Sequence, residues 1–71
     1  MVKLHLSDEK SWYKNFKAYI LPIYRVNNIP YDEVRAAILK PYNATFVHDM
    51  DGGWFIFEDD ELATLFLLRF S

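Results

Sequence analysis

Hydrophobic residues at the start of the chain follow a period of two. Val2, Leu4 and Leu6 alternate with Lys3 and His5. Side chains on a strand alternate between its two faces, so this pattern predicts a short, half-buried β-strand over residues 2–6.

The period then changes to that of a helix. Ser7 is a favourable N-cap, and Asp8 and Glu9 would stand in the first turn, where carboxylates interact favourably with the helix dipole. Pro22 is expected to limit this helix, because proline disfavours the helical conformation of the preceding residue and has no amide hydrogen. The apolar stripe at helical spacing consists of Trp12, Phe16, Tyr19, Ile20 and Ile23.

A second, shorter helix is expected after a connection over residues 24–30. It would begin at Pro30 or Tyr31, with Asp32 and Glu33 in its first turn, and end at Pro41. Its apolar line consists of Tyr31, Val34 and Ile38.

A β-hairpin is predicted from about residue 44 to residue 58. Two apolar runs flank Asp51-Gly52-Gly53, and Asp-Gly between such runs is a strong hairpin signal, because glycine accepts the positive φ of these turns. We place Asp51-Gly52 at the tip, since a tip at Gly52-Gly53 would pair Val47 with Glu58. The predicted cross-strand pairs are Phe46 with Phe57, Val47 with Ile56, and His48 with Phe55.

The last element is predicted to be a helix that opens with Asp59-Asp60-Glu61. Leu62, Phe66 and Phe70 form one line along it, with Ala63 and Leu67 beside them, and this stripe suffices to dock on the sheet. Leu65 and Leu68 fall outside the stripe. The order strand, helix, helix, strand, strand, helix predicts a small α+β domain spanning residues 1–71, with an antiparallel sheet and its hairpin packed against helices.

Composition is consistent with a small self-supporting core. The chain has 71 residues, of which 52% are hydrophobic and 18% aromatic, and it contains no cysteine. Large rings bury much area per residue, whereas the lack of cysteine excludes disulfides, thiol catalysis and thiolate metal sites. The N-terminus lacks the apolar core of a signal peptide, and no apolar run has the length of a membrane span, so we expect a cytoplasmic protein.

Charge is unevenly distributed along the chain. Residues 1–42 contain seven basic and four acidic residues, a net charge of +3, whereas residues 43–71 contain one basic and six acidic residues, a net charge of −5. Such polarity can orient a partner during association.

The C-terminal third resembles small uncharacterised accessory proteins of tailed bacteriophages. The resemblance lies in an aromatic strand, an acidic turn and a helix that ends in Phe-x-Leu-Arg-aromatic. The residues that carry it are Gly53-Trp54-Phe55-Ile56-Phe57-Glu58-Asp59-Asp60, followed by Ala63, Phe66, Leu68, Arg69 and Phe70. The resemblance implies a phage protein that acts in the cytoplasm of an infected bacterium, and it implies no particular activity.

Two acidic segments are candidates for sites of chemistry. His48 and Asp49 would point to opposite faces of a strand, which makes a poor metal site, and a calcium loop starting at Asp49 would have Trp54 at the position that requires glycine. Four successive acids at a helix start, residues 58–61, are normally solvated rather than catalytic. We therefore expect no enzymatic activity, no metal and no cofactor.

Basic residues of the first helix are candidates for a different function, although we favour an ordinary solvated helix face for them. Lys10, Lys14, Lys17 and Arg25 lie near Tyr13 and Tyr24, and cations beside aromatic rings are typical of nucleic-acid contacts. The net charge of −2 argues against this hypothesis, because nucleic-acid modules are usually basic.

The aromatic and leucine excess instead favours contact with a protein. Our leading interpretation is a protein-binding module, in particular a phage factor that inhibits or redirects a host protein. The alternatives are a nucleic-acid-binding module and a subunit of a structural homo-oligomer, and self-association is compatible with the leading interpretation. We expect no membrane and no small-molecule substrate among its partners. The candidate protein-binding residues are Trp54, Leu65, Phe66, Leu68 and Phe70.

Overall fold

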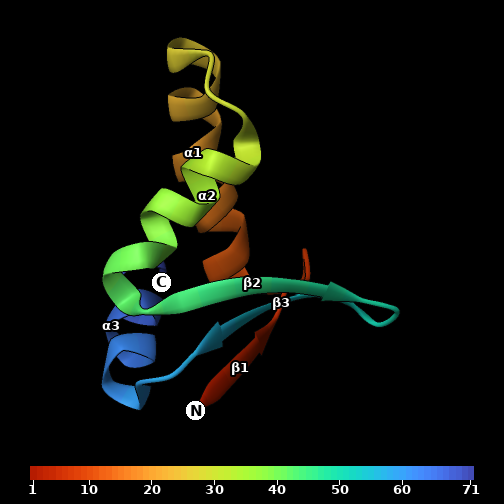
Figure 1. Cartoon of the computed structure of the whole chain (residues 1–71), viewed down its shortest axis with the longest axis vertical. Coiled ribbons are helices and arrows are strands. Elements are labelled where there is room, and N and C mark those ends of the chain that lie inside the picture. Colours follow the sequence, from red (N-terminus) through yellow and green to blue (C-terminus); the bar gives the residue numbers. More distant parts are fainter.

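The computed structural model describes residues 1–71, in which a three-stranded antiparallel sheet is packed with helices (Figure 1). The predicted α+β class and the predicted order of elements are confirmed. The elements are β1 (Val2–His5), α1 (Ser11–Asn27), α2 (Tyr31–Leu39), a 3-10 helix η1 (Lys40–Tyr42), β2 (Ala44–Asp49), β3 (Gly52–Phe57) and α3 (Asp60–Phe70).

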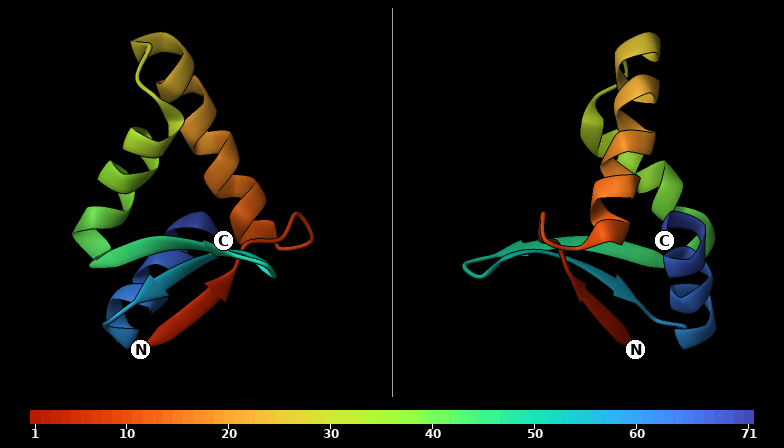
Figure 2. Two further views of the ribbon diagram at one scale, coloured as in Figure 1. Left: turned by 45° about the vertical axis from the view of Figure 1, so that its right-hand side comes forward. Right: turned by 180° about the vertical axis from the view of Figure 1, so that it is seen from behind.

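The strand order is β1-β3-β2, so β3 lies in the centre and both β1 and β2 are edge strands. Val2 pairs with Phe57 and Leu4 with Phe55, which directs the apolar side of β1 toward the helices. Helices α1 and α2 rise from one side of the sheet and meet at a tip far from it, whereas α3 lies beside the strands (Figure 2). The other face of the sheet is not covered by a helix.

The core is built mainly from phenylalanine. The three α-helices and the central strand contribute to one cluster of buried residues, and no buried residue is polar. Phe16 of α1, Phe55 of β3 and Phe66 of α3 form a triangle of rings with centroids 5.2 to 5.9 Å apart. The buried residues are Phe16, Ile20, Val34, Leu39, Phe55, Phe57, Ala63, Phe66 and Phe70.

The hairpin forms as predicted, but its predicted register is wrong. The turn consists of Met50 and Asp51, and neither has a positive φ. Gly52 has φ 118° and follows the turn. In the predicted turn Gly52 would be the second residue of the tip, whereas in the structure the positive φ that requires glycine comes directly after the tip. The observed pairs include Phe46 with Phe55, Val47 with Trp54, and His48 with Gly53. The observed register differs from the predicted register by an even number of residues, so each side chain still lies on the face of the sheet that was predicted for it.

Helix α1 begins later than predicted. Ser7 accepts a hydrogen bond from the Glu9 N–H through Oγ, and its carbonyl accepts one from the Lys10 N–H, so Ser7 stabilises a turn rather than the helix. Lys10 takes the N-cap position with an extended backbone and no side-chain cap, and Ser11 is the first helical residue.

Pro22 does not end α1, contrary to the prediction. The helix continues to Asn27, although proline in a helix interior removes a hydrogen bond and costs about 3 kcal/mol relative to alanine. Packing offsets part of this cost, because Ile23 packs on the core and the ring of Tyr24 lies 6.0 Å from that of Tyr31. The helix ends where Asn28 adopts a left-handed conformation.

The predicted beginning of α3 is confirmed. Asp59 is the N-cap, and its carboxylate accepts hydrogen bonds from the N–H groups of Glu61 and Leu62 at 2.8 and 3.4 Å. The acidic first turn that follows complements the helix dipole. This cap fixes the direction of α3 directly after β3.

The turn geometry predicts that Gly52→Ala is destabilising. Alanine rarely adopts a φ of 118°, and its Cβ would lie 3.1 Å from His5 Nε2. We expect the free energy of unfolding to fall by about 1–3 kcal/mol, measured by urea denaturation with circular dichroism. Met50→Ala at the exposed turn is the control and should change stability by less than about 0.5 kcal/mol. Equal stability of the two variants would contradict this turn geometry.

Candidate functional site

Helix α3 has one buried and one exposed face. Ala63, Phe66 and Phe70 are buried in the core, whereas Leu65 is 54% exposed and Leu68 is 67% exposed. The prediction that these two leucines lie outside the docking stripe is confirmed. Burying a leucine side chain contributes about 1.5–3 kcal/mol of favourable free energy. A partner that covered Leu65 and Leu68 would therefore gain this free energy on binding.

Two of the candidate binding residues are not accessible. Phe66 is 0% exposed and Phe70 is 4% exposed, so their rings stabilise the core and cannot anchor a partner. Their expected role as interface anchors is therefore corrected. The helical period that places Leu65 and Leu68 outward places these two phenylalanines inward.

Arg69 lies beside the exposed leucines and is held by two tyrosines. Its guanidinium donates hydrogen bonds to the hydroxyl of Tyr19 at 2.9 Å and to the hydroxyl of Tyr42 at 3.2 Å. These hydrogen bonds, with that to Tyr42 the stronger influence, raise the pKa of Arg69. Arg69 forms no salt bridge within the chain, and a guanidinium has five N–H donors. Its fixed position and remaining donors suit a carboxylate from another molecule.

We call Leu65, Leu68 and Arg69 the α3 ridge. Leu65 and Arg69 are four residues apart and therefore neighbours on the helix surface. Tyr19 of α1 is 42% exposed and extends the surface beyond Arg69. Tyrosine and arginine are enriched among the residues that dominate protein interfaces. The exposure of the two leucines can be predicted from the helical period of the sequence. The contacts of Arg69 with Tyr19 and Tyr42 cannot be predicted from a local pattern, because they join segments that are distant in the sequence.

Trp54 lies on the uncovered face of the sheet and lines a surface hollow together with Leu67 of α3, but with none of the three ridge residues. The His5 ring lies 4.5 Å from its ring, and Lys3 Nζ lies 4.5 Å from the ring centroid. Its indole N–H donates a hydrogen bond to the Asp49 carboxylate at 3.2 Å. The ring is thus packed by its own neighbours, and the structure does not bring Trp54 together with the exposed leucines.

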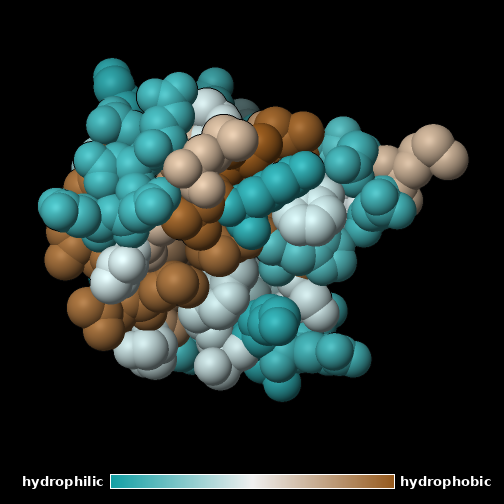
Figure 3. All heavy atoms as spheres, turned by 90° about the horizontal axis from the view of Figure 1, so that it is seen from below, coloured by the Kyte–Doolittle hydropathy of each residue, from teal (hydrophilic) through white to brown (hydrophobic).

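The underside of the molecule combines apolar and polar regions. Seen from below, hydrophobic side chains gather toward the side where α3 lies in Figure 1, and hydrophilic side chains border them (Figure 3). The half-buried Ile56 and the exposed Val47 contribute apolar groups on the uncovered sheet face. Apolar surface bordered by polar groups is typical of protein contacts.

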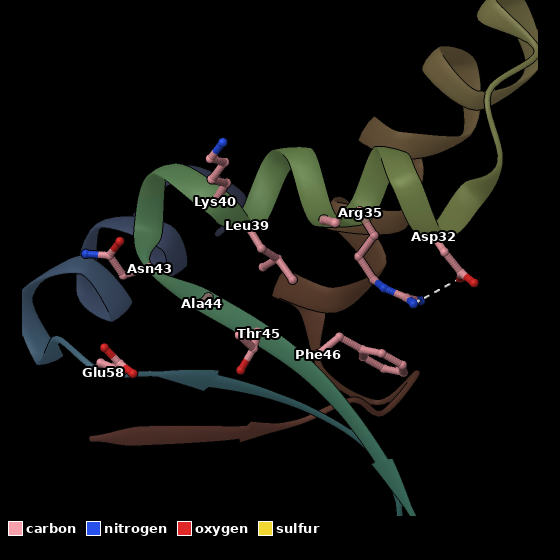
Figure 4. Close-up of a pocket in the computed structure, with 10 residues that line it drawn as sticks. Asp32, Arg35, Leu39, Lys40, Asn43, Ala44, Thr45, Phe46 and Glu58 are labelled. Atoms are coloured by element: carbon pink, nitrogen blue, oxygen red, sulfur yellow. Dashed lines mark hydrogen bonds and ion pairs between the residues drawn. The ribbon is translucent and has the colours of Figure 1, made fainter.

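A groove of about 640 Å³ lies between α2 and the edge strand β2 (Figure 4). Arg35 crosses it, paired with Asp32 at 3.0 Å, and its guanidinium lies 3.7 Å above the ring of Phe46. Lys40 and Glu58 lie toward its other end. The guanidinium of Arg35 therefore packs on Phe46 at one end of the groove, and we assign the groove no chemistry.

The candidate residues for metal binding or acid–base chemistry have local structural roles. Asp59 caps α3, and the Asp49 carboxylate accepts hydrogen bonds in the hairpin turn. His5 Nε2 lies 2.9 Å from the carbonyl oxygen of Asp51, and His48 is exposed on β2. No group of three or more histidine, aspartate or glutamate side chains is arranged to hold a metal ion.

The basic residues of α1 are partly neutralised. Lys17 forms an ion pair with Asp8 and lies 4.8 Å from the centroid of the Tyr13 ring. The hydrogen bond from Lys17 lowers the pKa of Asp8 and raises that of Lys17. Lys10, Lys14 and Arg25 are exposed and form no salt bridge. Nucleic-acid binding through this helix therefore stays an alternative hypothesis.

No family model, curated protein or solved structure matches the chain. None of the three α-helices combines the length and hydropathy that a membrane span requires.

Asp49 provides a pH-dependent test of the hairpin. Desolvation raises its pKa, but hydrogen bonds from the Asp51 N–H and the Trp54 indole outweigh this effect, so the pKa lies below its ordinary value. Because the pKa of Asp49 is lower in the folded than in the unfolded state, its charged carboxylate stabilises the fold at pH values above the unfolded-state pKa of about 3.9. This stabilisation is lost as the pH falls through the folded-state pKa. Asn at this position can still accept a hydrogen bond but cannot be charged.

We therefore expect Asp49→Asn to reduce the urea midpoint at neutral pH, with the difference from the wild type shrinking below about pH 4. Asp51→Asn is the matched control, because the Asp51 side chain accepts no hydrogen bond in the structure. A difference that is independent of pH would contradict the role of the Asp49 charge.

Proposed function

We propose that this protein is a small binding module that acts by contacting another protein through the α3 ridge. The observation that supports the proposal is the exposure of Leu65 and Leu68 on a helix whose opposite face closes the core. Arg69 adds a fixed cation without a carboxylate partner next to this apolar surface. Arginine is enriched among the residues that dominate protein interfaces, and an exposed apolar patch bordered by polar groups commonly marks a protein contact.

We further propose that the partner is a host protein and that the chain is a phage accessory factor that inhibits or redirects it in the bacterial cytoplasm. The resemblance of residues 53–70 to such phage proteins supports this proposal. The excess of acid in residues 43–71 adds complementarity to a basic partner surface. No catalytic activity is part of the proposal, because binding alone can block or redirect a host protein.

The proposal predicts that a double variant, Leu65→Glu with Leu68→Glu, retains the fold and loses its partner. Both side chains are exposed, so their replacement should change the free energy of unfolding by no more than about 1 kcal/mol. Placing two charges in an apolar contact should abolish binding. Circular dichroism measures the fold, and quantitative capture from a bacterial host extract with mass spectrometry measures binding.

Val26→Glu is the matched control. Val26 is 82% exposed in the last turn of α1, and this end of α1 lies far from α3 in Figure 1. This variant should capture the same stoichiometric protein as the wild type. Identical capture by the ridge variant would contradict the proposed surface, and unfolding of the ridge variant would show that the leucines belong to the core.

A further inference from the structure

The exposed side of α3 carries opposite charges at its two ends. Glu61 lies in the first turn, is exposed and forms no salt bridge. Leu65 and Leu68 occupy the middle of the exposed side, and Arg69 lies in the last turn. Glu61 and Arg69 are eight residues apart, or about 12 Å along the helix axis.

Such a surface is complementary to itself when two copies of α3 lie antiparallel. A two-fold axis near Leu65 would place Glu61 of each copy beside Arg69 of the other, and the exposed leucines of both copies would meet between these charge pairs. In a symmetric contact of this kind, each favourable pair occurs twice. Antiparallel helices also place the positive end of one dipole beside the negative end of the other.

We propose that, in the free protein, the α3 ridge binds a second copy of this chain in an antiparallel, two-fold symmetric pair of α3 helices, which a host protein must displace to reach the ridge. This inference rests on the proposed function, because it assigns an occupant to the same surface. Arg69 favours a second copy at this end of the ridge, because it would pair there with Glu61 of that copy.

The size of the contact sets the expected affinity. A helix of 11 residues is about 16 Å long, so the interface falls at or below the small end of specific interfaces, roughly 1,200 Å² in total. Tyr19 beside Arg69 can enlarge it. We expect reversible association with a dissociation constant in the micromolar range, which sedimentation equilibrium can measure from micromolar to millimolar protein.

Charge reversal tests the geometry. Glu61→Arg or Arg69→Glu alone should weaken self-association roughly ten- to thirty-fold, because each turns two attractive contacts into two repulsive ones.

An equimolar mixture of the two variants should associate as tightly as the wild type. In the mixed dimer the unchanged Glu61 of one chain meets the unchanged Arg69 of the other, and the two substituted side chains, an arginine and a glutamate, meet at the opposite end. The double variant, with both substitutions in one chain, should also recover self-association.

Matched controls reverse charges at equivalent positions of other helices. Glu33→Arg lies in the first turn of α2 and Arg25→Glu in the last turn of α1, and both should self-associate like the wild type. Circular dichroism verifies folding of each variant. Arg69→Glu can unfold the protein, because it removes the hydrogen bonds of Arg69 to two tyrosines. In that case Glu61→Arg alone tests the pairing, because the Glu61 side chain has no hydrogen-bond partner in the structure and its replacement should leave the fold intact. This variant should then self-associate more weakly than the wild type.

The outcomes separate this inference from the proposed function. A wild type that is monomeric at all concentrations but captures a protein through Leu65 and Leu68 overturns self-pairing and leaves the proposed function standing. A monomeric wild type that captures nothing overturns both. A dimer that is insensitive to the charge reversals, or folded single variants that fail to associate when mixed, overturns the antiparallel arrangement.

Discussion

The fold depends on the docking of Phe66 among aromatic rings from several parts of the core. Its ring centroid lies between 4.9 and 5.9 Å from those of Trp12, Phe16, Tyr42, Phe55, Phe57 and Phe70. A chain of 71 residues without cysteine has few other means of stabilisation, because small domains bury a smaller fraction of their surface on folding than large ones do. Helix α3 therefore packs against both the sheet and α1, and this packing fixes its orientation.

That constraint also determines the exposed face of the same helix, which we propose to be the binding surface. Because Phe66 and Phe70 hold one face of α3 in the core, the opposite face presents Leu65 and Leu68 at fixed positions without cost to the core. The tyrosine contacts of Arg69 restrict a long side chain in the same way. Binding to such a surface loses less conformational entropy than binding to a mobile one. Rigid presentation, rather than a cleft, is what this small fold offers.

The elements are predictable from sequence where period and capping act locally. The hairpin, the Asp59 cap and the outward leucines all follow from nearby residues. The predictions fail where distant contacts decide. Gly52 is expected at the tip of the turn but takes its positive φ just after it, and Pro22 is expected to limit α1, although Ile23 and Tyr24 gain tertiary contacts beyond it. The Arg69 site depends on Tyr19 and Tyr42, which no local pattern connects to it.

The central claim is that α3 closes the core with one face and leaves the other free for a partner. The most direct measurement compares the free energy of unfolding of Phe66→Ala with that of Leu65→Ala by urea denaturation. Removing a buried phenylalanine costs about 3–5 kcal/mol, enough to unfold a small domain largely or completely, whereas Leu65→Ala should cost less than about 1 kcal/mol. Similar losses for the two variants would contradict the division of α3 into a core face and a free face.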